Sequence, residues 1–194
     1  MDYWIKVNQL FLWLIARTYL IITFSNTNVQ FKSTSLNKQH GYVIASNHQS
    51  NLDPFMILGA LPLNILMKLA PVKSMSHRNL FEHLPVRVML RSFGGFPTKE
   101  IKGLNYGLPF SFETLIDHGT IAIFPEGTRV KPGEKVEAKR GVAELASQPD
   151  TEVILCHLIW NKGKIKRVQI TISAPKNFSG QTAQMILDHI YAVA

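Results

Sequence analysis

Residues 42–61 read YVIASNHQSNLDPFMILGAL and contain one strand–loop–helix unit. The first five residues are aromatic, β-branched or small, a composition typical of a buried strand. A polar loop follows. Asp53 and Pro54 then suit a helix start, because an aspartate accepts backbone N–H groups there and a proline lacks the N–H that would go unpaired. We therefore expect an apolar helix directly after the strand and its loop.

The alternation of strands and helices continues along the chain. A polar stretch over residues 25–41 is expected to hold a further strand and a loop. We also expect strands at 65–73 and 120–124, helices over 79–95, 108–119 and 139–147, and a hairpin in which 152–160 and 164–173 flank Asn-Lys-Gly-Lys. This order predicts an α/β fold with a mixed, largely parallel sheet flanked by helices.

The composition is that of one well-packed domain. The chain has 194 residues, of which 46% are apolar and 18% charged, and this excludes a disordered chain. Its formal net charge of +8 indicates anionic partners such as phosphates, lipid head groups or nucleic acid. The one cysteine, Cys156, excludes an intramolecular disulfide and a multi-cysteine zinc site, and its apolar surroundings favour a core position.

The N-terminal region contains an apolar run at residues 10–24, LFLWLIARTYLIITF. Fifteen helical residues reach about 22 Å, short of a hydrocarbon core of about 30 Å, and Arg17 interrupts the run. A secretory signal is not favoured, because a basic start and a small-residue cleavage site are missing. We expect residues 1–30 to form a membrane-interface helix before a domain of residues 31–194. The alternative is a helix buried in the core.

The loop after the first quoted strand contains a candidate general base. His48 follows the strand directly, and Asp53 comes five residues later, where its carboxylate can fold back onto the imidazole ring. Such a pair leaves one ring nitrogen basic and stabilises the imidazolium that proton abstraction forms. The alternative gives Asp53 only a helix-capping role and His48 an ordinary surface position. The spacing also suits metal ligation, but with no third ligand nearby we predict no metal site.

A second polar loop, Phe124–Arg129, reads FPEGTR and again follows a strand of buried character. Gly127 permits a sharp backbone turn. Arg129 can bind a phosphate or carboxylate with its planar fork, Thr128 can donate to a phosphate oxygen, and Glu126 can orient a cation or a substrate hydroxyl. Taken alone, this hexapeptide could also be a charged connecting loop.

Together, the Asn-His-x4-Asp block that ends at Asp53 and the Phe-Pro-Glu-Gly-Thr-Arg block resemble the glycerolipid acyltransferase family, whose best-known members are 1-acylglycerol-3-phosphate acyltransferases. The resemblance extends over residues 40–160. It implies acyl transfer from a thioester, carried on coenzyme A or acyl carrier protein, to a hydroxyl of a lysolipid. It also implies that His48 is the base, that Asp53 orients it, and that Glu126 and Arg129 bind the acceptor.

One departure from the family pattern concerns the acceptor. The family's second block ends in an arginine thought to bind the acceptor phosphate. The matching stretch here, residues 94–100, reads GGFPTKE, and Lys99 or Glu100 takes the place of the arginine depending on the register. Lysine lacks the bidentate fork and glutamate would repel a phosphate. We include Lys99 with Glu126, Gly127, Thr128 and Arg129 in the expected substrate-binding set.

The resemblance favours 1-acylglycerol-3-phosphate as the acceptor, giving phosphatidic acid in phospholipid biosynthesis. We expect acyl-CoA or acyl-ACP as co-substrate and no cofactor. The expected partners are membrane lipids, with the chain on the cytoplasmic face as a monotopic or peripheral protein. Nucleic acid is not expected, since no nucleic-acid-binding motif is recognisable. The alternatives are acylation of another lysolipid, in phospholipid remodelling or on an amino- or glycolipid, and a non-catalytic module that binds anionic lipids.

Overall fold

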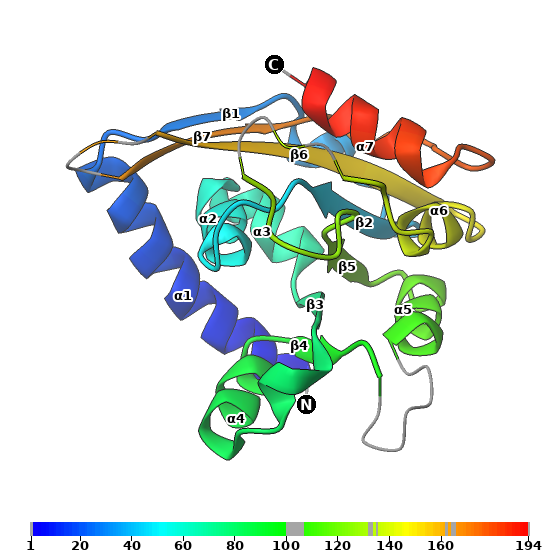
Figure 1. Ribbon diagram of the computed structural model, residues 1–194, viewed down its shortest axis with the longest axis horizontal. Helices are drawn as coiled ribbons and strands as arrows, with labels where there is room; N and C mark the ends of the chain where they lie inside the picture. Colours follow the sequence, from blue (N-terminus) through cyan, green and yellow to red (C-terminus); the bar gives the residue numbers. More distant parts are fainter. Residues whose placement is uncertain are drawn as a thin grey trace.

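The computed structural model describes residues 2–99, 107–131, 134, 136–161, 163 and 166–193. These residues form a seven-stranded sheet with helices on both faces (Figure 1). The strands described are β1 (Asn26–Val29), β2 (Gly41–Ser46), β3 (Val72–Ser76), β4 (Gly95–Pro97), β5 (Thr120–Ile123), β6 (Thr151–Asn161) and β7 (Arg167–Ile172). Their order across the sheet is β1-β7-β6-β2-β5-β3-β4.

Strand β2 lies in the middle of the sheet and pairs in parallel with β5 on one side and β6 on the other. Strands β3 and β4 continue the parallel part beyond β5, whereas β7 pairs antiparallel with β6 and parallel with β1. The sheet is therefore mixed and largely parallel, which confirms the predicted fold class. The parallel strands β6, β2, β5, β3 and β4 all end at one edge, and open α/β sheets bind their ligands beyond such an edge.

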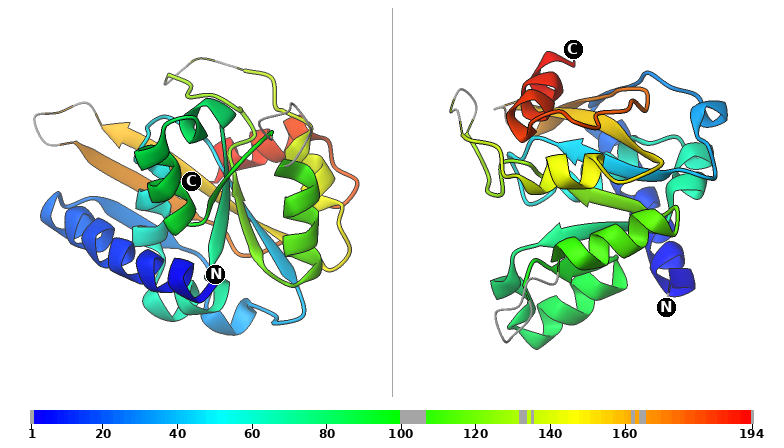
Figure 2. Two further views of the ribbon diagram at one scale, coloured as in Figure 1. Left: turned by 90° about the horizontal axis from the view of Figure 1, so that it is seen from below. Right: turned by 90° about the vertical axis from the view of Figure 1, so that its right-hand side faces the viewer.

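Helices cover both faces of the sheet (Figure 2). Those described are α1 (Asp2–Ile22), α2 (Asp53–Ala60), α3 (Leu63–Leu69), α4 (Leu84–Ser92), α5 (Gly107–Ile116), α6 (Gly141–Ala146) and α7 (Ala183–Ala192). Helices α1, α2 and α3 contribute to the core on one face, and α5, α6 and α7 to the core on the other. Every residue of β2 is buried, with Ile44 in the first core and Val43 and Ala45 in the second, as expected for a central parallel strand.

Helix α1 has one face in the core and one face exposed. Ile5, Gln9, Ala16 and Leu20 are buried. Gln9 Nε2 donates to Val72 O at 2.6 Å, and Gln9 Oε1 accepts from Val72 N at 3.0 Å, so the helix is attached to the start of β3. Strand β1, which also falls within the first thirty residues, joins the sheet through β7. The core-helix alternative thus describes the buried face, and the membrane-interface expectation for the exposed face stays a prediction.

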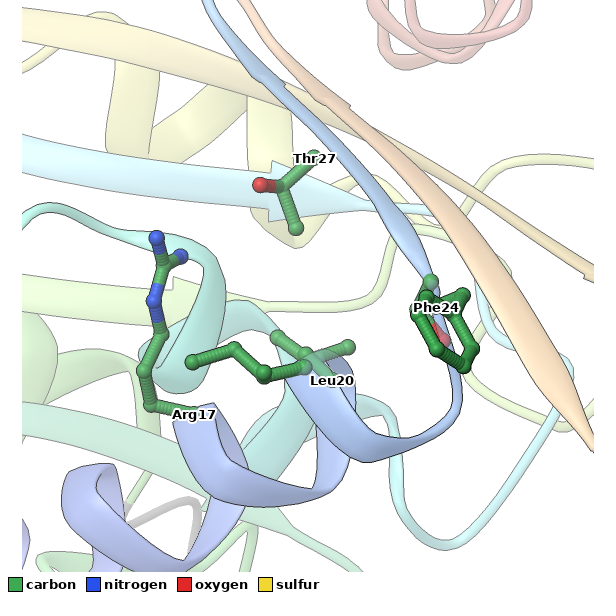
Figure 3. Close-up of a pocket in the computed structure, with 6 residues that line it drawn as sticks. Arg17, Leu20, Phe24 and Thr27 are labelled. Carbon is green, nitrogen blue, oxygen red and sulfur yellow. The ribbon is translucent and has the colours of Figure 1, made fainter.

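The position of Arg17 on α1 accounts for its place in an apolar run. Its guanidinium is half-buried and lies 3.4 Å from Gly59 O. Arg17 and Leu20 project from the helix beside a hollow of about 340 Å³, and Thr27 of β1 lies across it (Figure 3). The charge of Arg17 thus lies on the side of α1 that contacts the folded domain. The exposed apolar side of the helix does not carry this charge.

Three elements differ from the sequence-based expectation. Within the expected strand 65–73, residues 65–69 belong to α3, because Ile65, Leu66 and Leu69 repeat at helical spacing and are buried together. The strand β3 begins only after Pro71. The other two differences are the short strand β4 and the C-terminal helix α7, since no expectation covered them.

Other elements follow the expected pattern with adjusted bounds. The segment 79–95, expected as one helix, begins within a 3₁₀ turn, Arg78–Phe81, which α4 follows with Pro85 in its first turn. Strands β6 and β7 form the expected antiparallel pair. Lys162 and Lys164 of the expected turn between them lie outside the described residues.

Candidate active site

The two polar loops predicted from the sequence meet at the carboxyl edge of the sheet. The loop with His48 follows β2, and the FPEGTR loop follows β5, the neighbouring parallel strand. Val130 N donates to His48 O at 2.7 Å, and His48 N donates to Glu126 Oε2 at 2.7 Å. These two hydrogen bonds join the loops directly on either side of the histidine backbone.

The Asp53 carboxylate is fully buried and accepts hydrogen bonds on both oxygens. Oδ2 lies 2.9 Å from His48 Nδ1 and accepts from the backbone N–H groups of Gln49 and Ser50, each at 2.7 Å. Oδ1 accepts from the indole N–H of Trp160 at 2.7 Å. Asp53 therefore faces back across the loop, and its side chain caps no N–H group of α2.

The His48 ring is fixed on both its edge and its face. An ionised carboxylate can only accept, so a neutral His48 carries its proton on Nδ1 and leaves the lone pair on Nε2. The ring stacks on Phe124, with centroids 4.1 Å apart and planes 22° apart. The side chain retains 19% of its exposure. This arrangement leaves Nε2 with a lone pair on a ring that is partly open to solvent.

The loop that carries His48 is held to β6 by amide side chains. Asn47 is completely buried, and its side chain donates to Leu158 O at 2.8 Å and accepts from Leu158 N at 2.7 Å. Gln49 Oε1 accepts from Trp160 N at 3.2 Å. Because β6 is parallel to β2, these contacts continue the sheet pairing past the end of β2. They fix the position of the loop relative to the edge of the sheet.

Glu126 is turned into the protein. It is 1% exposed, and its two oxygens accept from His48 N–H and from the Tyr191 hydroxyl of α7. Burial raises the pKa of this carboxyl, and the two hydrogen bonds oppose that rise. Both oxygens are occupied by protein donors, so these contacts do not support the expected acceptor contact by Glu126, which stays a prediction.

The last three residues of the FPEGTR loop face solvent. Gly127 has φ of +67°, the left-handed region that the predicted sharp turn requires, and a Cβ there would meet the Lys139 side chain. Gly127, Thr128 and Arg129 are all exposed. Within the part of the chain that the structure describes, Arg129 makes no ion pair. The exposed guanidinium is of the type that binds anionic groups with its planar fork.

Lys99 is also exposed and follows β4, whose end lies at the same edge of the sheet. Strand β4 is three positions from β2, which at about 4.8 Å per strand separates them by roughly 14 Å. Arg129 follows β5, directly beside β2. Lys99 therefore follows a strand that lies farther from His48 than the strand before Arg129 does. Glu100, the other residue aligned with the family arginine, lies outside the described residues.

Two residues of the site were missed by the sequence reasoning. Trp160 ends the expected strand 152–160, and its indole N–H would have needed a partner at that edge. Tyr191 lies on the unexpected helix α7 and has no motif around it. Both act through Asp53 or Glu126 and touch the site from distant parts of the chain.

The described residues offer neither a cluster of metal ligands nor a reactive thiol at the site. No three His, Cys, Asp or Glu side chains cluster as metal ligands within the described ranges. Cys156 is completely buried, and burial raises the pKa of its thiol to about 12, so it remains protonated near neutral pH. This confirms the predicted core position of Cys156.

Comparison with known proteins agrees with the geometry. The family model for acyltransferases matches residues 27–158. The 1-acyl-sn-glycerol-3-phosphate acyltransferase of Limnanthes douglasii is 25% identical over 180 residues, which cover 88% of this chain and 62% of that protein. This chain thus spans about three-fifths of the length of that curated relative.

A solved structure has the same fold. The 1-acyl-sn-glycerophosphate (LPA) acyltransferase PlsC from Thermotoga maritima superposes with a TM-score of 0.67, at 21% identity, over 95% of this chain and 76% of that one. The family model covers more than half of the sequence and includes both loops that meet at His48. The chain therefore belongs to the acyltransferase family.

Proposed function

We propose that this protein is an O-acyltransferase that moves a fatty acyl group from a thioester to a hydroxyl of a lysolipid, with 1-acylglycerol-3-phosphate as the favoured acceptor. The observation that carries the proposal is the contact between His48 and a fully buried Asp53, at the carboxyl edge of a parallel sheet. The histidine is thereby oriented with its lone pair outward.

The proposed reaction uses His48 as the base. His48 Nε2 removes the proton of the acceptor hydroxyl as its oxygen attacks the thioester carbonyl carbon. The tetrahedral intermediate collapses, the C–S bond breaks, and the imidazolium returns its proton to the leaving thiolate. The products are an ester and a free thiol, and Asp53 stabilises the imidazolium between the two steps. A base of this kind contributes about 10²- to 10⁴-fold to the rate.

Arg129 is the proposed anion contact for the acceptor. It is exposed on the loop after β5 and lies one residue from Val130, whose N–H is bonded to His48 O. A phosphate bound by the arginine fork would hold the acceptor hydroxyl close to His48. Thr128 can add a neutral donor, and Lys99 a second charge from the direction of β4.

Membrane association through the exposed face of α1 is part of the proposal. The 21-residue helix is long and apolar enough to cross a bilayer, and 22% of its most apolar stretch is buried; core helices and signal sequences can meet the same criterion. Its exposed face carries large apolar side chains, which would lie among lipid acyl chains in a monotopic arrangement. Examples are Trp4, Phe11, Leu14, Ile15, Ile21 and Ile22.

Mass spectrometry of the products tests this function. Purified full-length protein is incubated with acyl-CoA or acyl-ACP and a panel of lysolipids that share one acyl chain and differ in head group. We expect phosphatidic acid from 1-acylglycerol-3-phosphate to form fastest. Faster product formation with a zwitterionic or sugar head group would reassign the acceptor. Binding to anionic vesicles without any product would support the non-catalytic alternative.

A further inference from the structure

The C-terminal helix is connected to the catalytic loop by one side chain. The Tyr191 hydroxyl donates to Glu126 Oε1, and Glu126 Oε2 accepts from the backbone N–H of His48. A single buried carboxylate thus joins α7 to the residue proposed as the base. Glu126 therefore contacts the backbone of His48 and the C-terminal helix, and neither contact involves the His48 ring.

The position of Tyr191 does not follow from core packing. Its side chain is 42% exposed, yet its hydroxyl reaches a carboxylate that is 1% exposed. A buried carboxylate needs donors on both oxygens, since each unpaired lone pair raises the cost of burying its charge. The tyrosine hydroxyl supplies the donor that the backbone of the FPEGTR loop does not.

Helix α7 is anchored firmly enough to orient this hydroxyl. Ile186, Leu187 and Ile190 are buried in the second core, and Thr182 caps the helix by accepting from Met185 N. The ring of Tyr191 also meets the ring of His157 on β6 edge to face, with centroids 5.4 Å apart. The orientation of the hydroxyl is therefore fixed by the same sheet that positions His48.

We propose that Tyr191 is a positioning residue for acyl transfer. Its hydroxyl holds Glu126 against the backbone of His48 and so keeps the imidazole in the position from which it removes the proton of the acceptor hydroxyl. This inference rests on the proposed function. Without the hydroxyl, Glu126 retains one donor and can rotate away, which releases the backbone N–H of His48. Misplacement of a reacting group by about 1 Å costs on the order of 100-fold in rate.

Tyr191→Phe tests the proposal, because phenylalanine keeps the ring and removes only the hydroxyl. We expect kcat to fall by roughly 10- to 100-fold while the KM of the acceptor changes less than about twofold. Tyr42→Phe is the matched control. It removes a tyrosine hydroxyl that bonds the backbone of Asn37, at the other end of β2 from His48, and should leave kcat unchanged.

The imidazole NMR signals of His48 give a readout that does not depend on turnover. We expect them to shift in Tyr191→Phe and to stay in place in Tyr42→Phe. Glu126→Gln provides a second variant should Tyr191→Phe fold poorly, because it keeps an acceptor for His48 N–H. The rate losses of Glu126→Gln and Tyr191→Phe should be less than additive in the double variant, because both changes act on one chain of contacts.

Wild-type kcat together with unshifted His48 signals in a folded Tyr191→Phe protein would overturn the proposal. Fully additive losses in the double variant would overturn it as well. Failure of the proposed function is a distinct result: the wild-type protein would form no acyl product, whereas the His48 signals would still report whether Tyr191 acts on the loop.

Discussion

Asp53 occupies the most constrained position of the site. Four N–H groups converge on its carboxylate, three on one oxygen and the indole of Trp160 on the other. An asparagine at this position would have to turn its own NH₂ group toward one of these sets of donors. The carboxylate is therefore needed both for the orientation of His48 and for the closure of the loop.

We accordingly expect Asp53→Asn to reduce kcat by orders of magnitude, through a wrong imidazole tautomer and a displaced loop. The variant should also unfold at lower denaturant concentration, since a buried donor loses its acceptor. Steady-state kinetics and urea unfolding on the same preparation measure both effects. An active Asp53→Asn protein would show that His48 does not depend on this partner.

Arg129 provides the second test at the scale of residues. A charge-assisted hydrogen bond from this exposed guanidinium to the acceptor would contribute about 1.5–3 kcal/mol, or roughly 10- to 150-fold in binding. We expect Arg129→Ala to raise the KM of the acceptor strongly at saturating donor, and Arg129→Lys to restore it only in part. Lys99→Ala should have a smaller effect, because Lys99 follows a strand farther from His48.

An unchanged acceptor KM in Arg129→Ala would remove this residue from the binding site. If Arg129→Ala raises the KM and Lys99→Ala leaves it unaltered, one cation binds the acceptor and the family's second-block arginine has no functional counterpart among the described residues. A large effect of Lys99→Ala would instead place the acceptor between β5 and β4.

At the scale of elements, α1 has two faces that call for different substitutions. Its buried face holds the start of β3 through Gln9, so removal of the whole helix would uncover the core. The exposed face can be changed without that loss. Phe11 and Leu14 are 64% and 57% exposed, and both point away from the buried face.

We expect Phe11→Ser with Leu14→Ser to weaken binding to anionic vesicles by at least about tenfold, because burying one large apolar side chain is worth about 1.5–3 kcal/mol. Ile116→Ser on α5, where Ile116 is 62% exposed, is the control and should bind as the wild type does. Co-sedimentation with vesicles measures both. Equal binding by all three proteins would contradict a lipid-facing α1.

Most of the strands and helices around the site could be predicted from the sequence, and the rest could not. The strand–loop–helix around His48 and the strand before FPEGTR were predictable, because local residue types determine them. Residues 65–73 were misassigned, since a short apolar run with a nearby proline fits a strand or a buried helix equally well. Helix α7 was missed, and with it Tyr191. Its contact with Glu126 joins residues 65 positions apart and exists only once the sheet is formed.

At the scale of the whole molecule, Glu126 couples the site to stability. Burial raises the pKa of its carboxyl above the ordinary value, so the folded state holds this proton more tightly than the unfolded state. The resulting stabilisation is fully present below the ordinary pKa and is lost as the pH rises through the raised one. Ionisation of Glu126 above this raised pKa therefore costs the folded state stability.

Glu126→Gln removes this titration. We expect the unfolding free energy of the wild type, taken relative to Glu126→Gln, to fall as the pH is raised from the ordinary pKa of a glutamate through the raised pKa of Glu126. Urea unfolding of both proteins at several pH values gives the difference directly. A difference that is flat, or that rises with pH, would show that the burial of Glu126 does not control its ionisation.

The central claim is that His48 is the base for acyl transfer, and the activity of His48→Ala tests it most directly. Product from 1-acylglycerol-3-phosphate and an acyl thioester is measured by mass spectrometry for the wild type, for His48→Ala and for His189→Ala, which removes an exposed histidine on α7. Circular dichroism verifies that both variants are folded. We expect the rate of His48→Ala to fall by about 10²- to 10⁴-fold and the rate of His189→Ala to match that of the wild type. Near-normal turnover by folded His48→Ala would contradict the account.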